Sequence, residues 1–176
     1  MKPWEDPRTP WKTKSEFMSY IRGCLRKSWN QHPVKLSVLK NQRKQVPNPN
    51  PRGNKKTVWG FECPLCGTED VIKNAQVDHK KPAGTLRDIS DIQQFAENLL
   101  VVVEEDLQLI CKGCNSTLAY ADKQGLSFEE AKATKQAIAI QKQKQDISWL
   151  KTAGITPASN AKARRQQIID YLLSKQ

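Results

Sequence analysis

Two pairs of cysteines, each separated by two residues, carry the strongest chemical signal in this chain. Cys63 and Cys66 form the first pair, and Cys111 and Cys114 form the second. Each Cys-x-x-Cys turn lets two thiolates reach one ion, and two such turns complete the tetrahedron of ligands that Zn²⁺ accepts. A site closed by four thiolates has no open coordination position, so we expect this zinc to stabilise the fold and not to catalyse.

A second polar group lies beside these pairs in the sequence. Asp78 directly precedes His79, and Asn115 directly follows Cys114. An imidazole titrates near neutral pH and can deprotonate water, whereas carboxylate and amide oxygens suit Mg²⁺. If zinc clamps the two turns, we expect Asn115 to join Asp78 as a ligand of this second metal. A satisfied Asp–His pair in a polar loop is the alternative that the residues themselves leave open.

Short strands are predicted to position these residues. Apolar runs predict strands at 58–63, 76–79 and 107–110, and a helix is expected to begin at Cys114 or Asn115. The segment 46–56, VPNPNPRGNKK, is predicted to be a basic linker without regular structure.

Capping signals predict the helices. Capping boxes begin at Thr13, Ser90 and Ser127. The helix that follows Ser90 should run through Phe95, and the helix that follows Ser127 should run to around Gln145. Other helices are predicted from Pro33 and, as a pair around a Gly/Pro turn, in the C-terminal 30 residues or so. Cys24 lies on the apolar face of the first helix and is expected in the core, whereas His32 is expected to be a surface or capping residue. The fold class predicted is α+β.

The charge of the chain is segregated. The net charge is +11, and residues 1–60 hold 14 Lys/Arg against 3 Asp/Glu, residues 61–122 hold 5 against 11, and residues 123–176 hold 10 against 4. Basic arms on either side of an acidic centre favour nucleic-acid binding by the arms over acidic lipid, since no strongly apolar helix face accompanies the charge. We therefore predict a basic helical arm and linker at 1–56, a zinc-bearing core at 57–125 and a helical DNA-binding region at 126–176.

The combined motifs resemble those of the HNH endonucleases, particularly phage members with a zinc-clamped strand–strand–helix site. The matching segments cover about residues 16–123 and are CPLC, VDHKKPAG, FAENLLVVVEEDLQLICKGCN and the basic helix YIRGCLRKSW. The resemblance implies that His79 is the general base, that Asp78 and Asn115 hold a catalytic Mg²⁺ (or Mn²⁺), and that cleavage leaves 3′-hydroxyl and 5′-phosphate ends. Asp106 aligns with the family's middle asparagine and, when ionised, could accept but not donate hydrogen bonds.

The C-terminal segment WLKTAGITPASNAKARRQQIIDYLL resembles small helix–loop–helix modules such as the SAP domain, although a plain helical hairpin is the alternative. The expected core of this module is Leu150, Gly154, Ile155, Ile168 and Leu172. The side chains predicted to contact DNA across the whole chain are Arg22, Arg26, Arg43, Lys44, Lys162, Arg164 and Arg165.

The predicted function is therefore a metal-dependent DNA endonuclease, either a homing-type nicking enzyme or a branched-DNA resolvase. A non-catalytic zinc-containing DNA-binding regulator is the alternative from another class. The sequence contains neither a signal-peptide pattern nor an apolar run of membrane-spanning length, so we expect a soluble protein in the cytoplasm, that of a bacterial host if the chain is phage-encoded.

Overall fold

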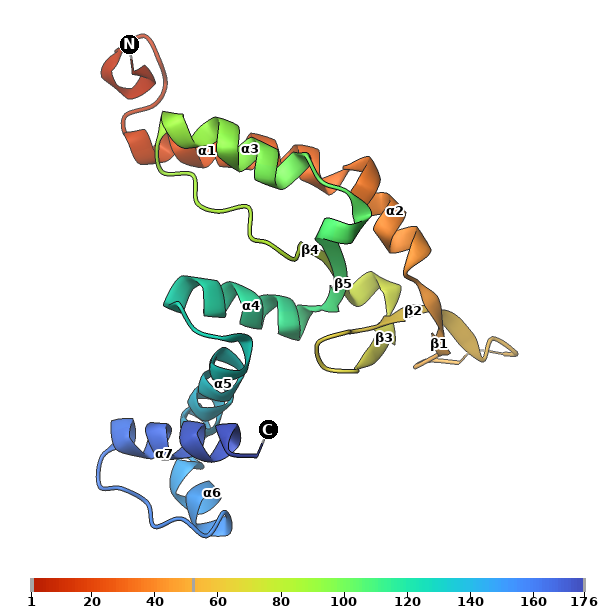
Figure 1. Cartoon of the computed structure of the whole chain (residues 1–176), viewed down its shortest axis with the longest axis vertical. Helices are drawn as coiled ribbons and strands as arrows, with labels where there is room; N and C mark the ends of the chain where they lie inside the picture. The colour runs from red at the N-terminus through yellow and green to blue at the C-terminus, as the bar shows by residue number, and fades with distance from the viewer. Residues whose placement is uncertain (1, 52, 176) are drawn as a thin grey trace. The chain divides into compact units, whose positions relative to one another are not determined.

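The computed structural model describes residues 2–51 and 53–175, and it confirms the α+β class (Figure 1). By compactness the chain divides into two units, Met1–Lys112 and Gly113–Gln176. The boundary between these units falls within a helix, and the division predicted from sequence at 56 and 125 stays a prediction.

The first unit contains two small antiparallel sheets. One has the strand order β1 (Lys44–Pro47), β2 (Thr57–Glu62), β3 (Glu69–Val71), and the other pairs β4 (Ala75–His79) with β5 (Leu107–Cys111). The strands predicted at 58–63, 76–79 and 107–110 are confirmed to within one residue at each end.

The predicted linker is wrong at its start, because Val46 and Pro47 belong to β1. Val46 is buried, and a Cβ on Gly60 of the neighbouring strand would lie 2.2 Å from its Cγ2. The missing side chain of Gly60 therefore makes room for Val46 against β2, which composition could not reveal.

The helices of the first unit are α1 (Lys14–Asn30), α2 (Pro33–Asn41) and α3 (Ile92–Leu100) (Figure 1). Buried residues of α1, of α3 and of the loop before α3 form a separate apolar cluster of Met18, Leu86, Phe95 and Leu99. The capping box at Thr13 and the helix start at Pro33 are confirmed. Cys24, however, is exposed rather than part of the core, because it lies at the edge of the buried stripe of α1.

The predicted capping box at Ser90 is wrong. Asp88 forms the box with Asp91 instead, around a single 3-10 turn that leads into α3. The helix then runs past the predicted end at Phe95 to Leu100, because Phe95 and Leu99 both face the apolar cluster.

The second unit is helical. Its elements are α4 (Lys112–Gln124), α5 (Phe128–Lys142), α6 (Asp146–Thr152) and α7 (Ala161–Leu173). The capping box at Ser127 is confirmed, whereas α4 begins two residues before Cys114 and α5 ends before Gln145, where Lys144 has a left-handed φ of 55°. Four members of the predicted module core are confirmed, since Leu150 and Ile168 are buried with Ala137, and Ile155 and Leu172 pack against them. Gly154 was wrongly included, because it is exposed in the turn after α6, where it has a φ of 78°.

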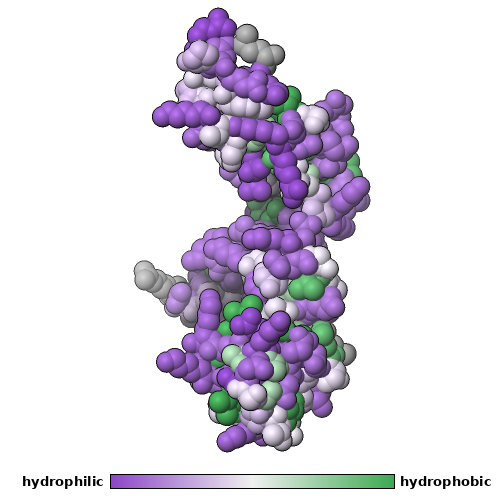
Figure 2. Space-filling view, turned by 90° about the vertical axis from the view of Figure 1, so that its left-hand side faces the viewer, coloured by the Kyte–Doolittle hydropathy of each residue, from purple (hydrophilic) through white to green (hydrophobic). Residues whose placement is uncertain are grey.

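The surface is largely polar. The mean hydropathy of the chain is −0.69, and hydrophilic residues dominate the face drawn in Figure 2, with hydrophobic ones scattered between them. In the part of the chain that the structure describes, no helix combines the length and the apolar character needed to span a bilayer.

Candidate metal centre and neighbouring polar site

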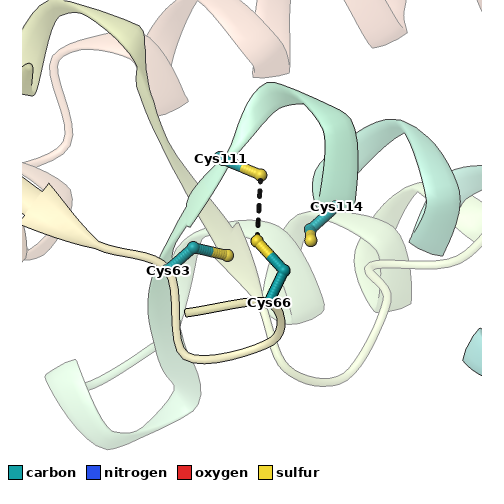
Figure 3. Close-up of side chains that lie close together, drawn as sticks. All are labelled: Cys63, Cys66, Cys111 and Cys114. Atoms are coloured by element: carbon teal, nitrogen blue, oxygen red, sulfur yellow. Dashed lines mark hydrogen bonds between the residues drawn. The ribbon is translucent and has the colours of Figure 1, made fainter. Parts of the chain in front are cut away.

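The four paired cysteines converge on one point. The Sγ atoms of Cys63, Cys66, Cys111 and Cys114 all lie within 4.8 Å of one another (Figure 3). Tetrahedral zinc with Zn–S bonds of about 2.3 Å requires sulfur–sulfur distances of about 3.8 Å. The distance from Cys66 Sγ to Cys111 Sγ is 3.8 Å, whereas a disulfide requires about 2.05 Å. The cysteines therefore fit a metal ion such as zinc, as the sequence predicted.

Local backbone geometry explains why each pair converges. After β2, the carbonyl of Cys63 accepts hydrogen bonds from the N–H groups of Cys66 and Gly67 at 3.3 and 2.8 Å, and Gly67 takes a φ of 68° that favours glycine. Cys111 ends β5, and the helix that follows at once places Cys114 in its first turn. A strand–turn arrangement thus presents one pair and a strand–helix junction presents the other.

Asp78 and His79 lie together at the end of β4, as predicted. In the β4–β5 ladder Asp78 is paired with Gln108 and His79 with Leu107. These pairs lie at one end of the ladder, and Cys111 lies at the other end. Asp78 is half-buried, and this burial raises the pKa of its carboxyl, although the backbone N–H of His79 and the charge of the imidazole act in the opposite direction. A carboxylate held in such surroundings favours a nearby cation.

The ring of His79 is fixed by two contacts. Its Nε2 lies 3.0 Å from the carbonyl oxygen of Leu99, and the ring of Trp29 lies 4.3 Å away, centroid to centroid, at 39°. A carbonyl oxygen can only accept, so Nε2 must carry the proton, and in neutral imidazole Nδ1 then carries the lone pair. The environment therefore selects the tautomer of His79.

His32 makes a parallel contact that the sequence did not reveal. Its Nε2 lies 2.9 Å from the carbonyl of Leu100, its ring lies 5.4 Å from that of Trp29, and its Nδ1 is buried without a hydrogen-bond partner in the described structure. The two histidines thus cap consecutive carbonyls at the C-terminus of α3, where a helix leaves such groups unpaired. His32 is half-buried rather than exposed, and it occupies the N-cap position of α2, so the capping alternative of the prediction is confirmed, although its side chain makes no capping hydrogen bond to that helix.

Asp106 organises the loop beside His79. Its backbone carbonyl accepts from the N–H of Lys80 at 2.8 Å, and its side chain accepts from the N–H of Val103 at 2.9 Å. Both bonds use Asp106 as an acceptor. A cavity of about 380 Å³ opens next to this loop, and its lining includes His79, Lys81 and Asp106.

Asn115 is half-buried in the first turn of α4, directly after Cys114. It belongs to the second unit, whereas Asp78 belongs to the first. Its role as a metal ligand beside Asp78 therefore stays a prediction.

The seven basic residues predicted to contact DNA differ in how they are held. Arg22 donates to the carbonyl of Leu86 at 2.6 Å, and Lys44 lies 2.6 Å from both Glu62 and Glu69. The exposed members of the set are Arg26, Arg43, Lys162 and Arg165.

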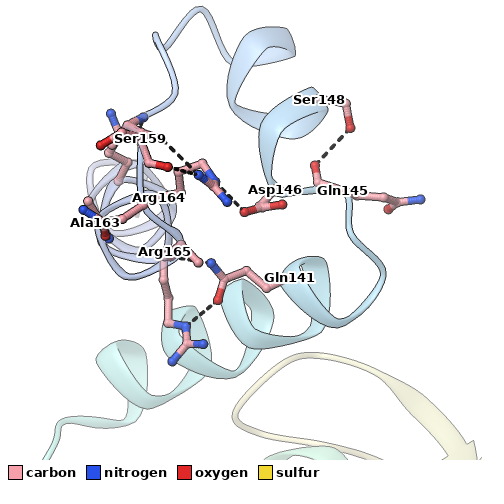
Figure 4. A network of polar contacts seen from close by, with 12 residues as sticks. Gln141, Gln145, Asp146, Ser148, Ser159, Ala163, Arg164 and Arg165 are labelled. Atoms are coloured by element: carbon pink, nitrogen blue, oxygen red, sulfur yellow. Dashed lines mark hydrogen bonds and ion pairs between the residues drawn. The ribbon is translucent and has the colours of Figure 1, made fainter.

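Arg164, the remaining member, is held inside the second unit (Figure 4). It donates to Asp146 at 2.7 Å and to the carbonyls of Ala158 and Ser159 at 3.1 and 2.9 Å. Its side chain is 15% exposed, and that of Asp146 is 11% exposed. The structure thus gives Arg164 an internal role that the sequence analysis did not foresee.

The chain has no detectable relative in three comparisons, since no family model, no curated protein and no solved structure matches it.

Proposed function

We propose that this protein is a metal-dependent DNA endonuclease of the HNH type, with zinc as a structural ion. The observation that carries the proposal is the state of His79. With Nε2 committed to the Leu99 carbonyl, Nδ1 is the nitrogen left to act as a base. If His79 served only to cap α3, it would need its Nε2–H as a donor, but it would not need the carboxylate of Asp78 beside it in the sequence.

In the proposed reaction, His79 takes a proton from the water that attacks the scissile phosphate. Trp29 and the Leu99 carbonyl hold the imidazole in place, and the Asp106 carbonyl holds the backbone of Lys80 next to it. Products with 3′-hydroxyl and 5′-phosphate ends follow if the 3′-oxygen is the leaving group.

Asp78 and Asn115 offer the oxygen ligands that Mg²⁺, or Mn²⁺ in its place, would take. When bound, such an ion supplies positive charge that neutralises the phosphate and stabilises the leaving oxygen. The half-burial of Asp78, which raises its pKa, is consistent with a position meant for a cation.

The proposed DNA contacts are revised by what the basic side chains already bind. The exposed residues Arg26, Arg43 and Lys162 remain candidates for phosphate contacts. Arg165 is exposed as well, although its Nε–H donates to the side chain of Gln141 at 2.7 Å. Arg22, Lys44 and Arg164 have internal partners, so we expect smaller contributions to affinity from them.

The test is cleavage of supercoiled plasmid and of a four-way junction in Mg²⁺, with His79→Gln as the key variant. A glutamine amide can still donate to Leu99 but cannot act as a base, so we expect cleavage to fall about 10²- to 10⁴-fold. DNA affinity and zinc content should not change.

His32→Gln is the matched control, because it makes the same substitution at the other histidine that caps α3. We expect this variant to cut within a few-fold of wild type. Cleavage by His79→Gln at the wild-type rate would refute the proposed base, and a wild type that binds but never cuts DNA would favour a zinc-containing regulator.

A further inference from the structure

The two faces of the β1–β2–β3 sheet carry different side chains. Alternation along the strands places Lys44 on one face with Glu62 and Glu69, where all three form an ion-pair network. On the other face Trp59 lies opposite Gln45 in the ladder. The two glutamates that neutralise Lys44 are therefore turned away from Trp59. Asp70, opposite Phe61, shares the face of Trp59, and its carboxylate accepts from the side-chain amide of Asn74 at 2.9 and 3.0 Å.

Trp59 is exposed in a way that the other tryptophans are not. It is 46% exposed, whereas Trp4, Trp11, Trp29 and Trp149 are half-buried and each packs against another aromatic ring. The guanidinium of Arg43 lies over Trp59, 4.2 Å from the ring centroid. An exposed indole held in place by a guanidinium offers a flat surface on which another planar group can stack.

The chemistry around Trp59 indicates which ligand. Besides Lys44 on the opposite face, the described part of residues 40–60 contains the cations Lys40, Arg43, Lys55 and Lys56 and no Asp or Glu. Lys55 and Lys56 are exposed on the β1–β2 connection next to the strand that carries Trp59. An aromatic ring among cations suits a base stacked on the ring with its phosphates on the neighbouring charges.

We propose that Trp59, supported by Arg43, is a stacking site for an unpaired base of single-stranded DNA. Paired bases are already stacked in the duplex and cannot present a face to a side chain, so the site selects DNA with an unpaired segment. The inference rests on the proposed function in one respect, since it takes the ligand of the basic arm to be DNA, and it adds the substrate feature that this arm recognises.

The test measures binding rather than cleavage, with the full-length, zinc-loaded protein in buffer without Mg²⁺. Fluorescence anisotropy compares a fluorescein-labelled mixed-sequence 15-mer with the same strand in a blunt duplex. We expect Trp59→Ala to weaken binding of the single strand about tenfold. Binding of the duplex should change less than twofold, and Trp59→Phe should retain most of the single-strand affinity.

Salt dependence separates stacking from charge. Trp59→Ala removes no phosphate contact, so the slope of log K against log salt for the single strand should equal that of wild type. Lys56→Ala, the control on the β1–β2 connection, should reduce that slope by about 0.7. Melting curves and zinc content verify that each variant is folded.

An equal loss on both DNAs, or no loss on the single strand from a folded Trp59→Ala, would overturn the stacking site. The second result would leave Trp59 as a surface for another kind of partner. Because cleavage by His79 is scored separately, failure of the stacking site and failure of the proposed nuclease would be told apart.

Discussion

The strands that carry the cysteines and the helices at the C-terminus are stabilised by different means. The strands β2–β5 belong to two small sheets, so their buried residues are divided between these sheets and the loops around them. The sulfur atoms of four cysteines lie close enough together in this region to hold a metal ion. In α5–α7 the buried set is alanine, leucine and isoleucine, supplemented by the enclosed pair Asp146–Arg164. The first region thus offers four ligands that an ion could join, whereas the second is held by apolar packing and by an ion pair between its own side chains.

This difference matches the chemistry proposed for each region. A metal can hold loops that are too short or too polar to bury much apolar surface, which leaves their polar side chains available for a reaction. The helical segment holds its enclosed arginine, Arg164, against Asp146, where the pair serves the stability of the segment itself. The comparison predicts that zinc loss, charge loss and cap loss should each affect one region much more than the other.

The largest expected effect is that of zinc removal. Structural zinc binding contributes about 10 kcal/mol or more to the folding of small zinc-dependent domains. We expect Cys63→Ser, or chelation of the metal, to abolish amide hydrogen-exchange protection in β4 and β5 while α5 and α7 remain protected. Cys24→Ser is the matched control, because Cys24 is exposed and outside the cysteine cluster. Elemental analysis should find one zinc per chain, and protected strands in metal-free protein would contradict the prediction.

A smaller effect is expected from breaking the enclosed ion pair. Arg164→Ala leaves the carboxylate of Asp146 largely buried without its cation, which should lower the stability of the helical segment by about 3 kcal/mol. Arg165→Ala, at the next position, removes an exposed side chain that donates to the neutral amide of Gln141 at 2.7 Å, so it leaves no buried charge unpaired and should cost much less. Hydrogen exchange in α5–α7 measures both, and zinc content should be unaffected. Equal losses from the two variants would show that the pair is not special.

The same pair predicts a pH dependence. The Arg164 guanidinium holds the pKa of the Asp146 carboxyl below its usual value, so the folded state favours the ionised carboxylate. Its contribution is fully present above the unfolded pKa of about 3.9 and is lost as the pH falls through the lower folded pKa. The stability gap between wild type and Arg164→Ala should therefore be constant near neutral pH and close in strong acid. A gap that widened in acid would reverse the sign and contradict this assignment.

The smallest effects should come from the helix caps, one in each region. Ser127→Ala and Thr13→Ala both remove the side-chain acceptor of a complete capping box. Each change should cost about 1 kcal/mol. The loss should appear in exchange of α5 for the first variant and of α1 for the second, and a loss that spread evenly over both would mean that the regions unfold together.

Signals confined to neighbouring residues made most elements predictable. Thr13 and Ser127 were recognised as caps because the partner glutamate lies three residues later, and the strands around Asp78 and Leu109 were recognised by short apolar runs. The cap at Ser90 was misassigned because Asp88 offers an equally suitable acceptor two residues earlier. Local patterns cannot choose between such neighbours when the packing of the following helix decides the register.

By itself the sequence determined the α+β class, the four paired cysteines that could hold a metal and the adjacency of Asp78 to His79, because each of these depends on residue type and spacing. Only the tertiary structure decided the tautomer of His79, since Leu99 and Trp29 are distant in the chain and meet His79 through packing. It also decided which cations remain exposed, for Lys44 and Arg164 find carboxylates that lie 18 residues or more away in the sequence. Charge and periodicity in the sequence indicate which interactions a side chain can make. The partners that it meets in the folded chain determine which of these interactions remain available for a ligand.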